Sequence, residues 1–219
     1  MDAAVASRAP RARNKRAAGE NGGTRTPKRR DREVIDAAAK VFHRRGYADA
    51  SVQDIADELG ILKGSLYHYI DTKEDLLFRL LSETHDDVHA ILDEVAEMPD
   101  LDPLERLHLY VRRQVEFNVD NLVKMSVYYH DVERLSDERR AEIYNRRREH
   151  ERWVVDLISE AQEQGAADPK LDPKILSRCI FATIIWPYQW FRPGRDKRAD
   201  VAETCAHFAL SGVIGSAKR

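Results

Sequence analysis

Apolar residues return every three or four positions along most of this chain, which is the spacing of one face of an α-helix. The stripe is clearest in residues 31–45, where its members are Val34, Ile35, Ala38, Val41 and Phe42. Similar stripes predict further helices over residues 73–97, 104–121, 123–135, 136–164, 172–191 and 200–214. Because the alternating apolar and polar runs typical of β-strands are absent, the sequence predicts an all-α fold.

Residues 51–69 predict two short helices joined by a tight turn. Ser51 and Asp54 have the spacing of a capping box, in which a hydroxyl satisfies an amide of the first turn. Gly60 can end that helix in a left-handed conformation, and residues 63–69 then form a second helix rich in polar and aromatic tips. The arrangement matches the helix-turn-helix motif, whose second helix enters the major groove of DNA. An ordinary helical hairpin would fit the same pattern.

A longer run of residues carries a resemblance to a known family. The run reads Ser51-Val-x-Asp54-Ile55-Ala56-x-x-x-Gly60-Ile61-x-x-Gly64-x-Leu66-Tyr67-x-Tyr69-x-x-x-Lys73-Glu74-x-Leu76. It resembles the DNA-binding signature of the TetR family of transcriptional regulators, with about a dozen matching positions. The chain departs from that signature at Leu62, where Ser, Ala or Thr usually opens the recognition helix, and at Ile70, where Phe is usual.

The resemblance implies which residues contact operator DNA. The positions are Ser51, Lys63, Gly64, Ser65, Tyr67, His68, Tyr69 and Lys73. Base edges would be read chiefly by Lys63, Ser65 and His68, and the other polar side chains of the set would hold phosphates. Lys73 also begins the next helix, whose N-terminal amides attract phosphate.

Charge is unevenly distributed along the chain. Residues 1–30 carry a net charge of +7 and almost no large apolar residues, whereas the remainder carries −9, within a total of −2. Residues 1–30, with so few large apolar side chains, cannot bury enough surface to offset the entropy lost on ordering. We therefore expect them to form a disordered basic tail. The tail would either contact the DNA backbone or minor groove, or be solvated without such a role. We expect a three-helix DNA-binding domain over residues 31–77 and a ligand-binding and dimerisation domain over residues 78–219.

The family resemblance also implies a ligand cavity in the second domain. The candidate aromatic lining residues are Phe117, Tyr128, Tyr129, Trp153, Trp186 and Trp190, and the candidate cations are Arg113, Arg192 and Arg195. For each aromatic residue, the alternative to lining the cavity is ordinary packing in the core. Aromatic rings beside guanidinium groups suit an amphipathic anion, such as an acyl-CoA thioester.

A narrower resemblance lies in two stretches, ILKGSLYHYI and WPYQWFRP. They are similar to TetR-type repressors of actinobacterial steroid-ring or fatty-acyl degradation, which sense CoA thioesters. This similarity implies a repressor that a small amphipathic ligand releases from DNA. A different ligand class, such as a hydrophobic drug or an aromatic acid, stays open. So does a helical adaptor that does not bind DNA.

The last two predicted helices, residues 172–191 and 200–214, carry more apolar surface than a monomer of this shape would cover. Pro187 is expected to kink the first of them or to distort its last turns. We expect both to pair with their copies in a symmetric homodimer. Such a dimer would present two recognition helices to successive major grooves of a palindromic operator, about 34–36 Å apart. The helix that begins at Lys73 would couple ligand binding to release of DNA.

The sequence shows no signature of an enzyme. It has no glycine-rich phosphate loop, metal-ligand cluster or nucleophile motif, so we expect no catalytic residue, metal ion or cofactor. His85 and His89 stand four residues apart, but no partner in the sequence completes a metal site, and we expect them to be solvated. Cys179 and Cys205 are expected to be buried thiols of a reducing cytosol. No run is apolar enough to span a membrane, so we expect a cytoplasmic protein without a membrane partner.

Overall fold

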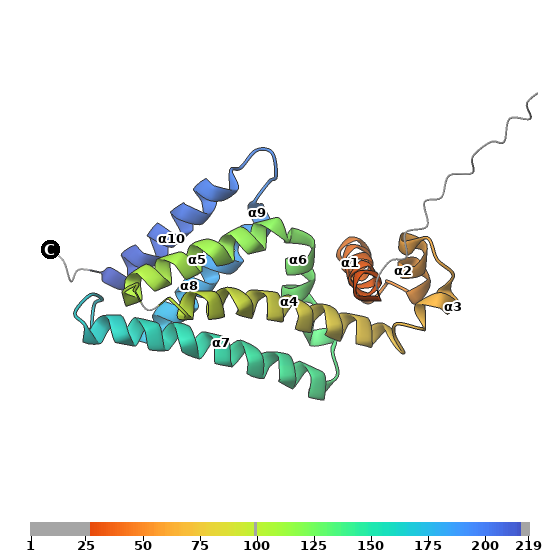
Figure 1. The fold of residues 1–219 in the computed structure, drawn as a ribbon, viewed down its shortest axis with the longest axis horizontal. Coiled ribbons are helices and arrows are strands. Elements are labelled where there is room, and N and C mark those ends of the chain that lie inside the picture. Colours follow the sequence, from red (N-terminus) through yellow and green to blue (C-terminus); the bar gives the residue numbers. More distant parts are fainter. Residues whose placement is uncertain (1–26, 99, 216–219) are drawn as a thin grey trace, which may run out of the picture.

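The computed structural model describes residues 27–98 and 100–215. Figure 1 shows a small unit of α1, α2 and α3 at one end and a larger bundle that α4 enters from this unit. The helices are α1 (Pro27–Arg45), α2 (Val52–Leu59), α3 (Lys63–Leu66), α4 (Lys73–Ala96), α5 (Pro103–Asp120), α6 (Leu122–His130), the 3₁₀ helix η1 (Val132–Arg134), α7 (Asp137–Glu163), α8 (Pro173–Ile185), α9 (Pro187–Trp190) and α10 (Arg198–Ile214). The prediction of an all-α fold is confirmed.

Helix α1 begins at Pro27, before its predicted start. Residues 1–26 of the expected basic tail lie outside the described residues. Residues 27–30, however, form the first turn of α1, so their assignment to a disordered tail is wrong. A proline at the first helical position costs no hydrogen bond, because the amides of the first turn have no helical partner. Arg30 also forms an ion pair with Glu33, three residues on, at 3.2 Å.

Helices α2 and α3 form the predicted pair around a glycine turn. The hydroxyl of Ser51 accepts a hydrogen bond from the amide of Asp54 at 3.1 Å, and the amide of Ser51 donates to the Asp54 carboxylate at 2.8 Å. Gly60 follows with a φ of 64°, in the left-handed region. Helix α3 is shorter than predicted: it ends at Leu66, whose carbonyl accepts the amide of Tyr69 at 2.9 Å. Such an i→i+3 bond belongs to a tight turn rather than an α-helix.

Helix α4 joins the small unit to the bundle. Thr72 caps it through a capping box with Asp75, and its buried face runs from Leu76 to Val95. The first part of this face belongs to a buried cluster shared with α1, α2, α3 and α6, and the last part to a cluster shared with α5, α7, α8 and α10. The predicted domain boundary after residue 77 therefore falls inside one continuous helix.

Two predicted helices are divided in the structure. The segment 172–191 forms α8 and then α9, which starts at Pro187. Proline has no amide to donate to the preceding turn and its ring clashes there, so α8 stops at Ile185. The segment 123–135 forms α6 and η1. None of the helices in the described ranges is both long and apolar enough to cross a membrane.

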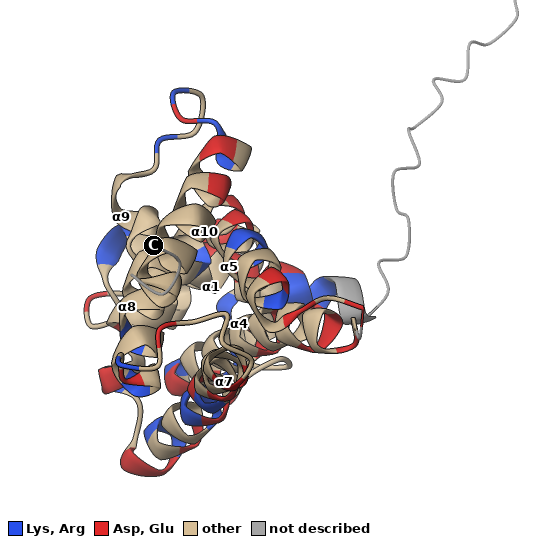
Figure 2. Cartoon of the chain, turned by 90° about the vertical axis from the view of Figure 1, so that its left-hand side faces the viewer, with Lys and Arg blue, Asp and Glu red and all other residues tan. Residues whose placement is uncertain are grey.

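Helices α8 and α10, and the residue that directly follows α8, leave apolar side chains uncovered in the single chain. Ile175, Trp186 and Phe208 expose 59%, 64% and 70% of their surface. Cys179 is also exposed and Cys205 is half-buried, so the expectation of two buried thiols is wrong for Cys179. Figure 2 shows α7 with many charges of both signs, in contrast to the mostly uncharged α8.

Replacement of Gly60 by Ala should destabilise the protein, because alanine adopts a φ of 64° only with strain. The free energy of unfolding should fall by about 1–2 kcal/mol. A Cβ at this position would meet no atom within 4 Å, so the backbone conformation and not crowding is the cause. Urea unfolding measures the change.

Gly64→Ala is the matched control for this prediction. Gly64 lies inside α3, has no left-handed φ and also has open space around it. Alanine should therefore raise the free energy of unfolding there, by up to about 1 kcal/mol. Equal losses at the two positions would contradict the explanation by backbone strain.

Candidate functional site

The surface around α3 projects away from the bundle (Figure 1). Leu66 is fully buried and anchors the helix, whereas Leu62 and Tyr67 expose 79% and 47% of their surface. Lys63 and His68 are exposed as well. Helix α3 and the turn after it therefore present a ridge of polar and aromatic side chains to the solvent.

The other predicted DNA-contacting residues surround this ridge. Gly64 is exposed, and Ser65 and Tyr69 are half-buried. Ser51 is exposed at the start of α2, where its hydroxyl is engaged in the capping box. The structure thus gathers the predicted positions at the start of α2, on and after α3, and at the start of α4.

Lys73 has a structural role that the sequence did not indicate. Its ammonium donates to the carbonyl oxygens of Tyr47 at 2.8 Å, Ala48 at 3.3 Å and Ala50 at 2.8 Å. It also lies 4.4 Å from the centroid of the Tyr47 ring. These contacts hold the loop between α1 and α2 against the first turn of α4.

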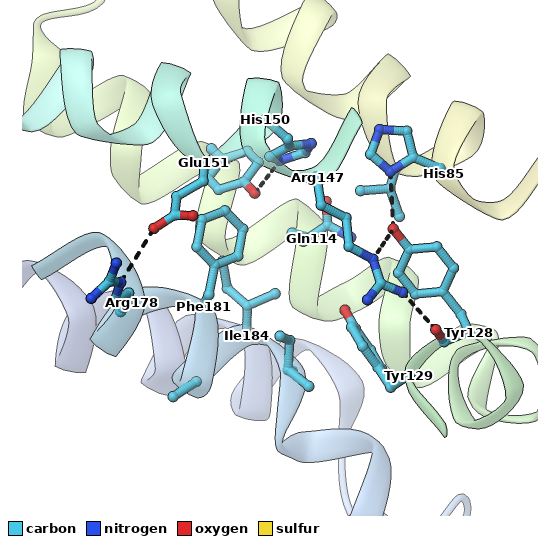
Figure 3. Close-up of a pocket in the computed structure, with 14 residues that line it drawn as sticks. His85, Gln114, Tyr128, Tyr129, Arg147, His150, Glu151, Arg178, Phe181 and Ile184 are labelled. Carbon is cyan, nitrogen blue, oxygen red and sulfur yellow. Dashed lines mark hydrogen bonds and ion pairs between the residues drawn. The ribbon is translucent and has the colours of Figure 1, made fainter. Parts of the chain in front are cut away.

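A cavity of about 440 Å³ lies inside the bundle, between α4, α5, α6, α7 and α8 (Figure 3). Its apolar and aromatic walls include Val88, Tyr110, Tyr128, Tyr129, Phe181 and Ile184. Its polar lining residues include His85, Gln114, Arg147 and His150. A mostly apolar cavity with a few polar groups is typical of a site for a small molecule.

Arg147 extends from α7 to the centre of the cavity lining (Figure 3). Its guanidinium donates to the carbonyl oxygen of Tyr128 at 2.6 Å and to the Tyr128 hydroxyl at 3.2 Å, and it lies 4.2 Å from the centroid of that ring. Among the described residues, no carboxylate forms an ion pair with Arg147. A half-buried cation without a counter-ion favours an anionic ligand, because an unpaired charge is costly to bury.

Two buried histidines, His85 and His150, lie on the cavity wall. Nδ1 of His85 is 2.9 Å from the Tyr128 hydroxyl, and Nε2 of His150 is 2.5 Å from the Tyr110 hydroxyl. Burial, and then the charge of Arg146, lowers the pKa of His85 to about 4. Burial likewise lowers the pKa of His150 to about 3. Both imidazoles are therefore neutral near pH 7 and offer hydrogen bonds rather than charge.

Three of the lining side chains each keep one buried polar atom without a hydrogen-bond partner. The atoms are Nε2 of His85, Nδ1 of His150 and Oε1 of Gln114. The amide nitrogen of Gln114, by contrast, donates to Asn118 at 3.1 Å. An unpaired buried polar atom costs about 1–3 kcal/mol, so a water or ligand group that reached one of these atoms would recover that cost.

Only two of the nine predicted ligand-contacting residues, Tyr128 and Tyr129, line this cavity. The ring of Trp153 lies beyond the wall, 5.3 Å from the ring of Tyr110. Phe117 packs against the buried cluster that includes α1 and α6. Trp153 and Phe117 are thus packed among core residues, which was the alternative for both.

The predicted residues around Pro187 lie outside the cavity. Trp186 and Trp190 expose 64% and 39% of their surface, because the chain turns where α8 gives way to α9. Arg192 lines a different hollow, between α1, α6 and α9.

The two remaining predicted cations are paired on the surface. Arg113 lies 2.7 Å from the carboxylate of Glu94, and Arg195 lies 3.0 Å from that of Asp196. Because each already has a counter-ion, neither offers an unpaired positive charge. Arg147, which the sequence reasoning missed, offers one.

The polar lining residues could have been found from their place in the helical stripe. His85 lies between Leu81 and Val88 on the buried face of α4, and it is 2% exposed, so the expectation that it is solvated is wrong. On α7, Arg147 lies about two turns and His150 about one turn before the apolar second half of the helix. A polar residue on the apolar face of an amphipathic helix is the signal.

Two family models match the sequence. Residues 34–80 match the model described as "Bacterial regulatory proteins, tetR family". Residues 100–213 match the model described as "Tetracyclin repressor-like, C-terminal domain", which spans most of the cavity-lining helices.

Curated relatives match over most of their length. The HTH-type transcriptional repressor KstR2 of Mycobacterium tuberculosis is 31% identical over 183 residues, which cover 83% of this chain and 91% of that protein. The repressor of the same name from Mycolicibacterium smegmatis is 30% identical over 190 residues, which cover 86% of this chain and 92% of that protein.

Solved structures have the same fold. The structure of the ketosteroid transcriptional regulator KstR2 of Mycobacterium tuberculosis matches with a TM-score of 0.79 and 29% identity, and the match covers 91% of this chain and all of that one. The crystal structure of AibR in complex with isovaleryl coenzyme A and operator DNA matches with a TM-score of 0.74 and 27% identity, over 84% and 98% of the chains.

The stability of the protein should fall as the pH decreases from about 6.5 towards 4. In the unfolded chain histidines take up protons near pH 6.5, whereas in the folded protein the pKa values of His85 and His150 are about 4 and 3. The unfolded state then binds more protons. The free energy of unfolding should therefore fall by up to about 1.4 kcal/mol per pH unit for each histidine, as measured by urea unfolding.

A double variant tests the assignment to these two side chains. His85→Gln with His150→Gln should flatten this dependence, whereas His68→Gln on the exposed α3 ridge should leave it unchanged. A slope that stays the same in the double variant would show that other groups set the acid sensitivity.

Proposed function

This chain belongs to the TetR family of bacterial transcriptional regulators, and on that premise we propose that it is a repressor released from its operator by an amphipathic anion. Regulators of this family bind DNA and are not enzymes. The anion would occupy the cavity beside Arg147. The observation that carries this proposal is the guanidinium of Arg147, which lies among aromatic rings without a carboxylate partner in the described residues.

We propose that α3 reads the operator. Lys63, Ser65 and His68 would contact base edges, and Gly64 would allow the backbone to approach the groove. The exposure of Lys63, Gly64 and His68 supports this assignment, and the burial of Leu66 supports it further, because a fixed helix keeps its contacts in register.

Phosphates would be held by Ser51, Tyr67, Tyr69 and Lys73. The ammonium of Lys73 already holds the loop between α1 and α2, so part of its contribution to DNA binding would be indirect. A Lys73 variant would therefore lose a support of the DNA-binding unit together with a charge. For this reason Lys73 is a poor position at which to test phosphate contacts alone.

An acyl-CoA thioester is the ligand class that we favour. The cavity, at about 440 Å³, lies near the small end of the range for ligand pockets, which suits an acyl group better than a whole CoA thioester. The anionic remainder would extend past Arg147 towards Arg178, which would have to exchange its ion pair with Glu151, at 3.6 Å, for the anion (Figure 3). The solved relative that carries isovaleryl coenzyme A supports this class. An aromatic acid would satisfy Arg147 as well, and a neutral hydrophobic drug would not.

Helix α4 would transmit ligand binding to DNA. His85 lies on the cavity wall and Thr72 caps the same helix beside α3, about 20 Å away at the rise of an α-helix. A ligand shifts the equilibrium only if it binds the DNA-free geometry better than the DNA-bound one. The ligand would therefore have to move His85 or the rings that contact it.

The dimer would form through α8 and α10. Ile175 and Cys179 on α8, Phe208 on α10 and Trp186, which directly follows α8, are all exposed, and a second copy of the chain would cover them. A symmetric pair of this kind would place two α3 ridges on one face of the operator.

His68→Ala should relax the sequence specificity of operator binding. Loss of a base contact costs about 1–3 kcal/mol at the base pair concerned, and it leaves binding to other sequences nearly unchanged. Selection from random duplexes, followed by fluorescence anisotropy with the selected operator and its point variants, measures the effect. His43→Ala, at the exposed joint between α1 and α6, is the control and should keep the wild-type preference. If both variants keep the same sequence preference, His68 does not contact the bases of the operator.

Arg147→Met should weaken the response to anionic ligands while leaving operator affinity intact. Removal of one partner of a charge-assisted contact costs about 2–5 kcal/mol, so the ligand concentration for half release should rise at least about thirtyfold. Isovaleryl coenzyme A and longer acyl-CoA thioesters are the probes, and release of labelled operator is the readout.

Arg148→Met is the matched control for the charge. Arg148 is the exposed neighbour on the same helix and donates to Asn145. The Arg148→Met variant should release the operator at the same ligand concentration as the wild type. Equal responses of the two variants would contradict the anion proposal, and release by neutral hydrophobic compounds alone would favour the drug-type alternative.

A further inference from the structure

Three potential metal ligands converge outside the cavity and away from α3. His108 lies on α5, and Glu203 and His207 lie one turn apart on α10, which runs beside α5 (Figure 1). Among the described residues, this is the set of three His, Cys, Asp or Glu side chains whose ligand atoms all lie within 4.8 Å of one another. None of the three lines the cavity.

Each of the two imidazoles already has nearly the spacing from the carboxylate that a metal ion imposes. Nε2 of His108 is 3.0 Å from Oε1 of Glu203, and Nε2 of His207 is 3.1 Å from the same oxygen. A tetrahedral ion with bonds of about 2.0–2.1 Å separates its ligand atoms by about 3.3 Å. Each imidazole would therefore have to move only a few tenths of an ångström relative to the carboxylate, and the three ligand atoms all lie within 4.8 Å of one another.

We propose that His108, Glu203 and His207 bind a divalent transition-metal ion of the zinc class. Two imidazoles and one carboxylate are a ligand set that zinc uses when it keeps a further position open. Two nitrogen donors disfavour Mg²⁺ and Ca²⁺, which prefer oxygen ligands. The side chain of His207 is 72% exposed, which gives the ion a route of entry and a water molecule access to the open position.

The ion would link α10 to α5, because its ligands come from both helices. The buried side of α10 consists largely of small residues, Ala202, Ala206 and Ala209, so a metal clasp would add to a contact made mostly by close packing. Phe208 lies about 100° around the helix from His207, and the metal site is therefore beside the exposed apolar face and not on it. Metal binding would stabilise the helix that carries this face, whether or not the cavity holds a ligand.

Zinc titration of the full-length protein without an affinity tag tests the site. Isothermal titration calorimetry with zinc chloride should show one ion per protomer, and zinc should raise the midpoint of thermal unfolding, because the ion binds the folded state. His207→Ala should weaken zinc binding at least about tenfold without loss of the fold, since the side chain is exposed. Glu203→Gln, which keeps the shape and removes the charge, should weaken it as well.

His89→Ala is the matched control. Nδ1 of His89 lies 3.1 Å from the carboxylate of Asp93 one turn on, so it repeats the pair of Glu203 and His207 without a third ligand among the described residues. This variant should bind zinc as the wild type does. If the wild type binds no zinc, or if His207→Ala and Glu203→Gln bind it as tightly, the three side chains form a hydrogen-bonded group only. Calorimetry and thermal unfolding with zinc do not involve DNA. Failure of the metal site can therefore be told apart from failure of the proposed repressor function.

Discussion

Helix α4 must keep one face buried in two places at once, and both functional parts of the molecule are positioned by this constraint. Near its start, Leu76 and Leu80 belong to the buried cluster of α1, α2, α3 and α6. Near its end, Leu92 and Val95 belong to the cluster of α5, α7, α8 and α10. His85 lies between these groups on the cavity wall. A ligand that displaces α4 must therefore disturb apolar packing at the DNA-binding end as well.

A second connection between the cavity and the small unit runs through α7. The carboxylate of Asp75, which pairs with Thr72 in the capping box of α4, accepts a hydrogen bond from Arg139 at 2.5 Å, and this bond lowers the pKa of Asp75. Glu74 accepts the amide of Ser136 at 3.0 Å. The first turns of α4 and α7 are thus held together, and α7 also carries Arg147. Contacts between a ligand and Arg147 would reach the DNA-binding end by this route too.

Much of the fold follows from local chemistry and was predictable. The helices were expected from apolar spacing, and the capping boxes at Ser51 and Thr72 fixed two starts correctly, because a cap depends on residues three positions apart. The end of α3 and the start of α1 were less accurate. There the last or first turn depends on packing and on competing hydrogen bonds, which the spacing of apolar residues does not record.

The sequence by itself determined the family, the helices and the exposed ridge of α3, since these depend on residues close together in the chain. Tertiary structure decided the sites that join distant residues. It brought Tyr128 next to Arg147, left Trp186 outside, buried His85, and placed His108 beside Glu203. Which face of each helix meets which neighbour depends on the packing of the whole bundle, and spacing along one helix cannot specify it.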